Sequence, residues 1–263
     1  MMIVAALFLA FAPPPALEAR AEMSTAVQAE TERSAKSIIE AAYEAAGGDT
    51  FRRPGTLKLT GYNIIRTPQG DEVLWDRYAM WRSFGDEKDD AHGANGKVRI
   101  EAWSGDALAL LLAFDGEVTT TKDGAMSDPS ANAMWASNFG YGAIRHALDE
   151  GWTQERMPDR LIDAEPAFMV TLTDPSGGKT MFGIRQKDDA IVYVGFDTPK
   201  GWHERVYSHF FSKPGTAWQQ AGRVRLFYDG VKANEAIWTD FEVGTPLPED
   251  LFRIESVPSA PTF

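Results

Sequence analysis

The most constraining feature of the sequence is a run of short segments with two-residue periodicity, from about residue 57 to residue 243. The first of them, Leu57–Tyr62, alternates apolar with other residues, and the turn sequence TPQG follows soon after it. From Leu161 onward, similar segments recur at intervals of roughly 12–18 residues, separated by turn sequences such as DPSGG, KDD and DG. This pattern predicts one continuous antiparallel sheet.

Several of these predicted strands carry apolar residues on both faces. In the segment 73–84, Trp75 and Trp81 share one side, while Tyr78 and Met80 share the other. A later segment, ALALLLAF, is apolar throughout. A strand that is apolar on both faces must be covered on both. The sheet therefore needs helices on one side and, on the other, either a filled core or a hydrophobic ligand.

Two helical segments can supply part of this cover. The first carries one apolar stripe with helical spacing and stops at the glycine pair GG. Its stripe consists of Ala35, Ile38, Ile39, Ala42, Tyr43 and Ala46. The second lies within residues 127–152, where Ile144, Leu148 and Trp152 have helical spacing. We expect an N-terminal amphipathic helix and an insert of one or two short helices.

The chain begins with features of an export signal. Residues 3–12 form an apolar run that would rise only about 15 Å as a helix, too short to span a bilayer. Ala19-Arg20-Ala21 is a small-residue cleavage site, although the start carries no Lys or Arg. A retained anchor and an ordinary buried segment are the alternatives. The expected organisation is a signal peptide (1–21), a disordered leader (22–31), one domain (32–255) and a flexible tail (256–263).

Composition limits the function classes. The formal net charge of −12 argues against nucleic acid and against adsorption to anionic lipid surfaces, since both attract clustered Lys and Arg. The absence of cysteine excludes disulfides, thiol catalysis and an N-terminal lipid anchor. Together with an export signal, this composition suggests the periplasm of a Gram-negative bacterium.

No catalytic or metal-binding constellation is evident. His203 and His209 share a face of one predicted strand with Arg205 and Tyr207, but six strand residues separate them by about 20 Å, too far to share a metal. We expect exposed polar residues there. The acidic segment 85–96 lacks the spacing of a calcium-binding loop and is expected to be an exposed loop. We predict no catalytic residue, no metal site and no cofactor.

The order of these elements resembles the LolA-like superfamily of lipoprotein-localisation factors. The matching pieces are an export signal, a helix ending AAYEAAGGD, a strand opening LKLTGY, the phrase FDG, a helical insert, and a meander ending LPEDLF. The resemblance implies a mainly β (α+β) fold: a single antiparallel, unclosed half-barrel whose two helical segments plug the concave face. It also implies a hydrophobic cavity for acyl chains and offers Arg77 and Arg82 as candidates for the functional arginine of that superfamily.

The preferred function is a non-catalytic periplasmic carrier of a lipid or an acylated, lipoprotein-like ligand. Expected partners are those acyl chains and, as a further candidate, an inner- or outer-membrane protein; no nucleic acid is expected, and the chain is expected to be a monomer. One alternative is an enzyme or signalling module with a polar site around His203 and His209. Another is a structural envelope protein without a ligand. The candidate cavity residues are Trp75, Met80, Trp81, Leu112, Phe114, Met134, Trp135, Phe139, Met169, Phe182, Val192 and Val194.

Overall fold

The computed structural model describes residues 33–86, 88–140 and 142–254. The expected signal peptide, leader and tail lie outside these ranges. The described elements from Ala35 onward belong to one compact unit. Within the described ranges, every helix is too short or too polar to cross a bilayer.

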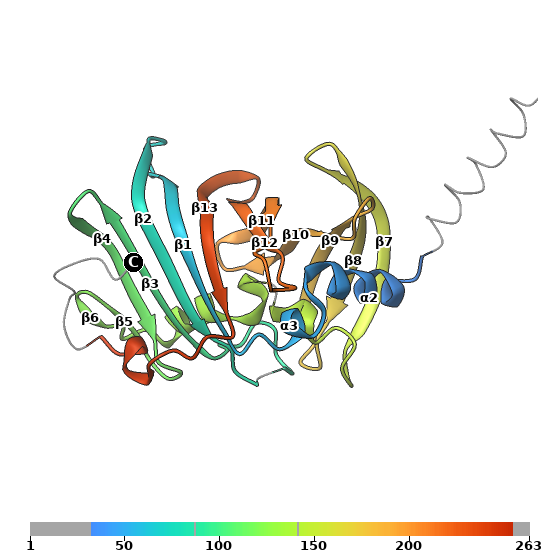
Figure 1. Ribbon diagram of the computed structural model, residues 1–263, viewed down its shortest axis with the longest axis horizontal. Helices are drawn as coiled ribbons and strands as arrows, with labels where there is room; N and C mark the ends of the chain where they lie inside the picture. Colours follow the sequence, from blue (N-terminus) through green and yellow to red (C-terminus); the bar gives the residue numbers. More distant parts are fainter. Residues whose placement is uncertain (1–32, 87, 141, 255–263) are drawn as a thin grey trace, which may run out of the picture. The chain divides into compact units, whose positions relative to one another are not determined.

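Strands make up most of this unit (Figure 1). They are β1 (Thr56–Arg66), β2 (Glu72–Ser83), β3 (Lys97–Ser104), β4 (Ala107–Phe114), β5 (Thr119–Thr121), β6 (Gly124–Ala125), β7 (Thr153–Ile162), β8 (Glu165–Thr173), β9 (Lys179–Arg185), β10 (Ile191–Thr198), β11 (Gly201–Phe211), β12 (Gln220–Tyr228) and β13 (Val231–Val243). The helices are α2 (Ala35–Ala46), α3 (Gly48–Arg52), α4 (Gly142–Arg145) and the 3₁₀ turns η1 (Pro129–Trp135), η2 (Ser137–Phe139) and η3 (Glu249–Phe252).

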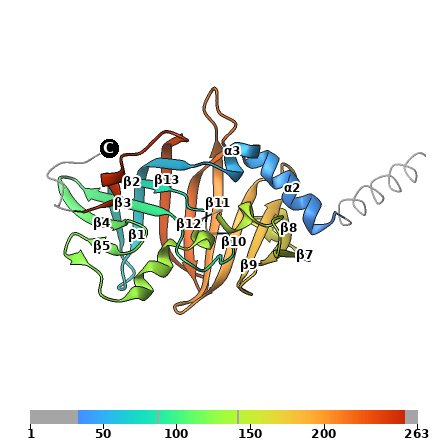
Figure 2. The ribbon, with the colours of Figure 1, turned by 90° about the horizontal axis from the view of Figure 1, so that it is seen from below.

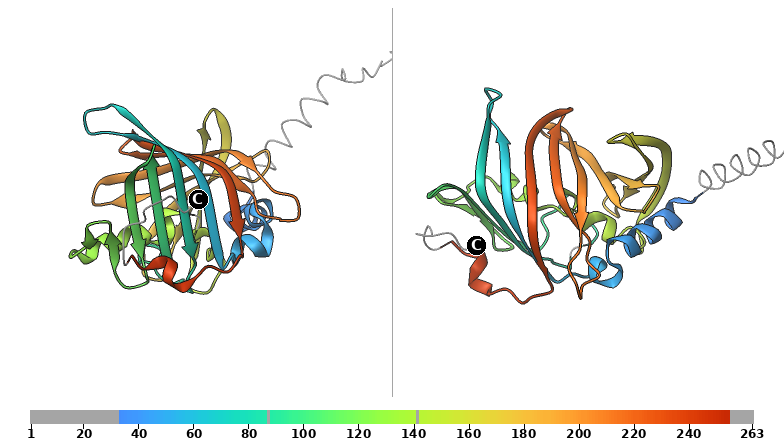
Figure 3. Two further views of the ribbon diagram at one scale, coloured as in Figure 1. Left: turned by 60° about the vertical axis from the view of Figure 1, so that its left-hand side comes forward. Right: turned by 45° about the horizontal axis from the view of Figure 1, so that its top comes forward.

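All thirteen strands form one antiparallel sheet in the order β6-β5-β4-β3-β2-β1-β13-β12-β11-β10-β9-β8-β7. Every neighbouring pair is consecutive in the chain except β1 and β13, which pair in the middle of the sheet. The two edge strands, β6 and β7, do not pair with each other, so the curved sheet stays open (Figure 3). The predicted mainly β, unclosed antiparallel half-barrel is confirmed.

Helix α2 buries the stripe that its sequence predicts. Its buried residues are Ala35, Ile38, Ile39, Ala42, Tyr43 and Ala46. They join the main hydrophobic core together with Phe168, Phe182 and Phe196 of strands β8, β9 and β10. The hydroxyl of Tyr43 donates a hydrogen bond to the carbonyl oxygen of Ile144, 2.7 Å away, and so ties α2 to the insert.

The insert of η1, η2 and α4 connects the two edges of the sheet, because it lies between β6 and β7 in the chain. Figure 2 shows it crossing the same face on which α2 lies. Two local features stabilise its turns. Asp128 caps η1 by accepting a hydrogen bond from the Ser130 amide at 2.9 Å. At Gly142 a Cβ would lie 2.7 Å from the Ser137 carbonyl oxygen, so only glycine fits.

The opposite face of the sheet carries smaller apolar clusters. Ala79 and Trp81 pack against Phe252 of η3, and Met169 packs in a separate cluster with Tyr193. This face also carries a buried ion pair: Arg99 lies 2.6 Å from the Glu101 carboxylate and donates a second hydrogen bond to the carbonyl oxygen of Leu251 in η3. The element η3 therefore covers the opposite face over β2 and β3.

Candidate ligand-binding site

An apolar cavity of about 300 Å³ lies between the sheet and the insert. Its floor is built by the adjoining strands from β4 through β1 and β13 to β11, and the insert covers it. The apolar lining from the strands includes Leu57, Leu59, Met80, Val98, Ile100, Leu112, Val224, Leu226 and Trp238, and that from the insert Met134, Trp135 and Phe139. This volume falls at the lower end of the range typical of small-molecule sites. On the concave face, α2 therefore fills the part over β8 to β10, and the cavity occupies the part over the strands from β4 to β11.

Five of the twelve candidate cavity residues line this cavity. They are Met80, Leu112, Met134, Trp135 and Phe139. Met80 of β2 and Leu112 of β4 both lie opposite Ile100 of β3, and the insert packs against this part of the sheet.

Four other candidates lie beside the cavity or across the sheet from it. Phe114 stacks on Trp135 with ring centres 6.4 Å apart, outside the lining. Trp81 faces the η3 side, because it neighbours Met80 in the strand and side chains alternate. Met169 and Val192 belong to the cluster on that same far face.

The remaining candidates also lie outside the cavity lining. Phe182 and Val194 are fully buried in the main core, which contains the apolar stripe of α2. Trp75 is part-buried on β2, opposite Asn63 of β1. These placements show that α2, rather than a hollow, occupies the concave face over β8 to β10.

Sequence reasoning missed several residues that line the cavity. Val224, Leu226 and Tyr228 repeat at two-residue spacing on β12, and Tyr78 lies two residues before Met80 on β2. Strand alternation places each set on one face. That signal was available in the sequence, but only the strand order shows that the two sets face one cavity.

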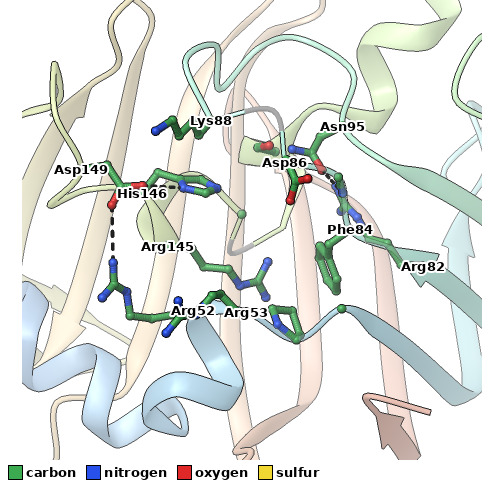
Figure 4. Close-up of a pocket in the computed structure, with 15 residues that line it drawn as sticks. Arg52, Arg53, Arg82, Phe84, Asp86, Lys88, Asn95, Arg145, His146 and Asp149 are labelled. Atoms are coloured by element: carbon green, nitrogen blue, oxygen red, sulfur yellow. Dashed lines mark hydrogen bonds and ion pairs between the residues drawn. The ribbon is translucent and has the colours of Figure 1, made fainter. Parts of the chain in front are cut away.

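A second, polar pocket of about 550 Å³ adjoins the cavity; we call it the basic pocket. Arg82, Phe84 and Arg145 line both spaces. The basic pocket also contains Arg52, Arg53, Lys88, Asp86, His146 and Asp149 (Figure 4). The Asp149 carboxylate lies 3.5 Å from Arg52 and 2.9 Å from Nδ1 of His146, so it is already engaged.

Arg82 is buried, with 7% of its surface exposed; of these cations only Arg145, at 5%, is less exposed. Its guanidinium donates one long hydrogen bond, 3.4 Å, to the Trp135 carbonyl oxygen and lies 5.0 Å from the centre of the Phe84 ring. Its Nε is buried without a partner among the described residues. Burial, and the positive charge of Arg205, lower the pKa of Arg82 to about 10, so the group is still charged at neutral pH.

Arg205 of β11 lines the same cavity from another strand. Its Nε donates to Nε2 of His203 at 3.1 Å, and its guanidinium lies 5.5 Å from the ring centre of Phe139. Burial raises the pKa of Tyr78 and of Tyr228, and the charge of Arg205 only partly opposes this rise. Both phenols therefore remain protonated hydrogen-bond donors on the cavity wall.

The polar site suggested around His203 and His209 is not assembled. His203 is fully buried rather than exposed, among the rings of Phe139, Phe196 and Tyr228. His209 is exposed and has a positive φ of 56° within β11. Burial, and the nearby charge of Arg205, lower the pKa of His203 to about 3. A buried imidazole with that pKa cannot act as a base near neutral pH.

No cluster of three or more His, Asp or Glu side chains within the described ranges could hold a metal ion. Of the described residues that line the apolar cavity, none is acidic. The described lining of the cavity therefore combines apolar side chains with cationic groups.

No protein-family model matches the sequence, and neither does any curated protein. Solved structures with a similar fold exist. A DUF1329 family protein from Desulfovibrio piger is 9% identical, with a TM-score of 0.49. A LolA superfamily protein from Nitrosomonas europaea is 14% identical, with a TM-score of 0.45. Each alignment covers 84% of this chain and 97% of the other. The likeness of both structures to this chain concerns the fold alone.

Proposed function

We propose that this protein is a non-catalytic carrier that holds an acyl chain of a lipid or lipoprotein in the apolar cavity. The observation that supports the proposal most is the cavity itself. It is about 300 Å³ in volume, is lined by aliphatic and aromatic side chains of strands and insert, and continues into a polar pocket. The LolA-like resemblance of the sequence implies the same role.

The acyl chain of the ligand would enter between the sheet and the insert. Met80 and Leu112 of the floor, and Met134, Trp135 and Phe139 of the cover, are the candidate residues that we propose to contact it. Methionine adapts its shape to irregular ligands, so Met80 and Met134 suit a flexible alkyl chain. We also propose that the carrier works in the periplasm, behind a cleaved signal peptide.

A chain-length series tests the proposal. Alkyl alcohols with eight to fourteen carbons are titrated against a fluorescent acyl probe below their solubility limits. Each CH₂ that leaves water contributes about 0.8 kcal/mol, so the affinity should rise about fourfold per carbon until the cavity is full. Affinity independent of chain length would overturn the carrier function.

A pair of matched variants locates the binding. Met80→Trp fills the cavity, and Met181→Trp adds the same bulk next to the cluster on the far face of the sheet. Both changes are expected to cost about 1–3 kcal/mol of folding stability. Only Met80→Trp should abolish probe binding, and equal losses in the two variants would contradict the assignment.

The location is tested separately. The full chain is expressed in a Gram-negative bacterium with its own first residues, and the mature protein is sequenced from its amino terminus. We expect the protein in the periplasmic fraction, starting after the Ala19-Arg20-Ala21 site. A cytoplasmic protein that retains the apolar run would contradict this part of the proposal.

A further inference from the structure

The apolar cavity is positively charged although the protein as a whole is strongly acidic. Its lining includes three guanidinium groups, from Arg82, Arg145 and Arg205, and no described acidic residue. The whole chain has a formal net charge of −12. A cavity that held only hydrocarbon would need none of these charges, because a buried cation without a counter-charge costs several kcal/mol.

Arg82 and Arg205 line the cavity from two different strands. Neither forms an ion pair with a carboxylate of the described residues; they contact neutral groups, among them the Trp135 carbonyl, the imidazole of His203, the Tyr207 hydroxyl and aromatic rings. The two arginines also lie close enough for Arg205 to disfavour the charged form of Arg82. Two cations that repel each other in a low-dielectric site are stabilised most by an anion between or beside them.

Arg145 adds a third positive group at the junction of the cavity and the basic pocket. Its Nε donates to the Phe51 carbonyl oxygen at 2.7 Å, and its guanidinium lies 4.5 Å from the centre of the Phe84 ring. Figure 4 shows Arg145 and Arg82 entering the basic pocket from different elements, with Phe84 between them. The ring of Phe84 lies against both guanidinium groups, a contact that holds a cation in place without a carboxylate.

We infer that the ligand is an anionic amphiphile: its alkyl chain lies in the apolar cavity, and its oxyanion head, a phosphate or a carboxylate, binds Arg82 and Arg205. This inference rests on the proposed carrier function and names its substrate class. Arginine presents a planar fork of donors that matches such oxyanions. The protonated hydroxyls of Tyr78 and Tyr228 supply neutral donors on the same wall.

The test uses four probes against the full chain. Dodecyl phosphate and dodecanoate carry the anionic head, dodecanol carries the same chain without a charge, and inorganic phosphate carries the charge without a chain. We expect both anionic probes to bind at least about tenfold more tightly than dodecanol, the size expected of one charge-assisted hydrogen bond. Inorganic phosphate alone should neither bind tightly nor displace dodecyl phosphate.

Two variants test which arginines bind the head group, and a third variant serves as the control. Arg82→Met and Arg205→Met should each weaken dodecyl phosphate binding about tenfold or more and leave dodecanol binding within about threefold. Arg66→Met, at the exposed end of β1, should change neither. Because Arg82 forms no ion pair with a carboxylate of the described residues, the ligand-free Arg82→Met protein should melt no lower than the wild type, whereas a merely structural arginine would lower the melting temperature when removed.

The outcomes separate the two proposals. Equal binding of dodecanol and dodecyl phosphate would overturn the anionic head group and leave the carrier standing. Binding of none of the alkyl probes would overturn the carrier itself. Displacement of dodecyl phosphate by inorganic phosphate, with no binding of dodecanol, would show an oxyanion site that needs no chain and would also overturn the inference.

Discussion

Arg205 donates a hydrogen bond from Nε to Nε2 of His203, with 3.1 Å between the two nitrogens. Only a neutral imidazole with a free lone pair on Nε2 can accept this bond, so the proton of the ring lies on Nδ1. The relationship joins a charged wall residue of the cavity to a fully buried ring beneath it. In this tautomer His203 accepts a hydrogen bond that helps to hold Arg205 in position.

The first prediction concerns the titration of His203. Its pKa is lowered to about 3 in the folded protein by burial and by Arg205, whereas an unfolded histidine titrates near 6.5. The ring resonances of His203 should therefore stay those of a neutral imidazole from pH 8 down to about pH 4. Nuclear magnetic resonance of ¹⁵N-labelled histidine measures this directly, and a midpoint near 6.5 for His203 would refute it.

The same group makes stability depend on pH. Between about pH 6.5 and pH 3 the unfolded state binds a proton that the folded state does not, so stability falls as the pH falls through this window. The slope from this one group is about 1.4 kcal/mol per pH unit. His203→Gln keeps an acceptor and removes the titration, so its denaturation midpoint should fall less steeply with pH. Parallel profiles for the two proteins would contradict the prediction.

Tyr43→Phe tests the tie between α2 and the insert. The substitution removes the hydroxyl that donates to the Ile144 carbonyl at 2.7 Å and leaves that buried acceptor unsatisfied. We expect the free energy of unfolding to drop by about 1–3 kcal/mol in urea titrations. Tyr62→Phe on β1, half-buried, is the matched control and should stay within about 0.5 kcal/mol. A Tyr43→Phe protein as stable as wild type would show that this bond contributes nothing.

The buried ion pair on the far face should behave unlike a surface pair. Glu101→Leu leaves Arg99 without its counter-charge and should cost about 3–5 kcal/mol. Glu242→Leu breaks the part-exposed pair with Lys58, 3.1 Å apart, and should cost no more than about 1 kcal/mol. Chemical denaturation of both variants provides the comparison, and similar losses in the two would contradict the burial argument.

Asp174 should hold the segment 85–96 in place. Its carboxylate accepts hydrogen bonds from the amides of Ala91 at 2.7 Å and Gly178 at 2.8 Å, and from the Ser176 hydroxyl. Burial raises the pKa of Asp174, but these bonds outweigh it and the net pKa is lowered. Its stabilisation is therefore present above the ordinary pKa near 3.9 and is lost as the pH falls through the lower folded value.

Asp174→Asn weakens these bonds without changing the size of the side chain. Amide hydrogen exchange at Ala91 should accelerate by about tenfold or more in the variant, because the segment opens locally. Exchange in the core of β9 should not change. Uniform acceleration across the sheet would show a global loss of stability instead of a released loop.

Local patterns were sufficient to predict the elements of this fold. Helical spacing in the first helix identified each residue that α2 buries, because an amphipathic helix has one way to face a core. Two-residue alternation and turn sequences likewise predicted the antiparallel meander, because each strand and each turn has its own local pattern. Each of these signals depends only on residues that are close together in the sequence.

Those local patterns could not predict which residues face the cavity. Alternation puts Met80 and Trp81 on opposite faces but does not say which face is concave. The choice depends on the curvature of the whole sheet. The position of α2 decides that Phe182 and Val194 pack in the core instead of lining a hollow. Arg82 was a candidate only through the family resemblance. Its place near Arg205 could not be predicted, because the two residues lie on β2 and β11, with three strands between them in the sheet.

The methionine methyl groups offer the most direct measurement of the central claim. Met80 and Met134 line the apolar cavity, whereas Met157, Met169 and Met181 belong to the cluster on the far face. With ¹³C-methyl-labelled methionine, addition of dodecyl phosphate or dodecanol should shift the Met80 and Met134 signals and give nuclear Overhauser contacts from them to the alkyl chain. The other three signals should stay in place. No shift at Met80 and Met134, or contacts confined to the far-face methionines, would contradict a carrier with its ligand in this cavity.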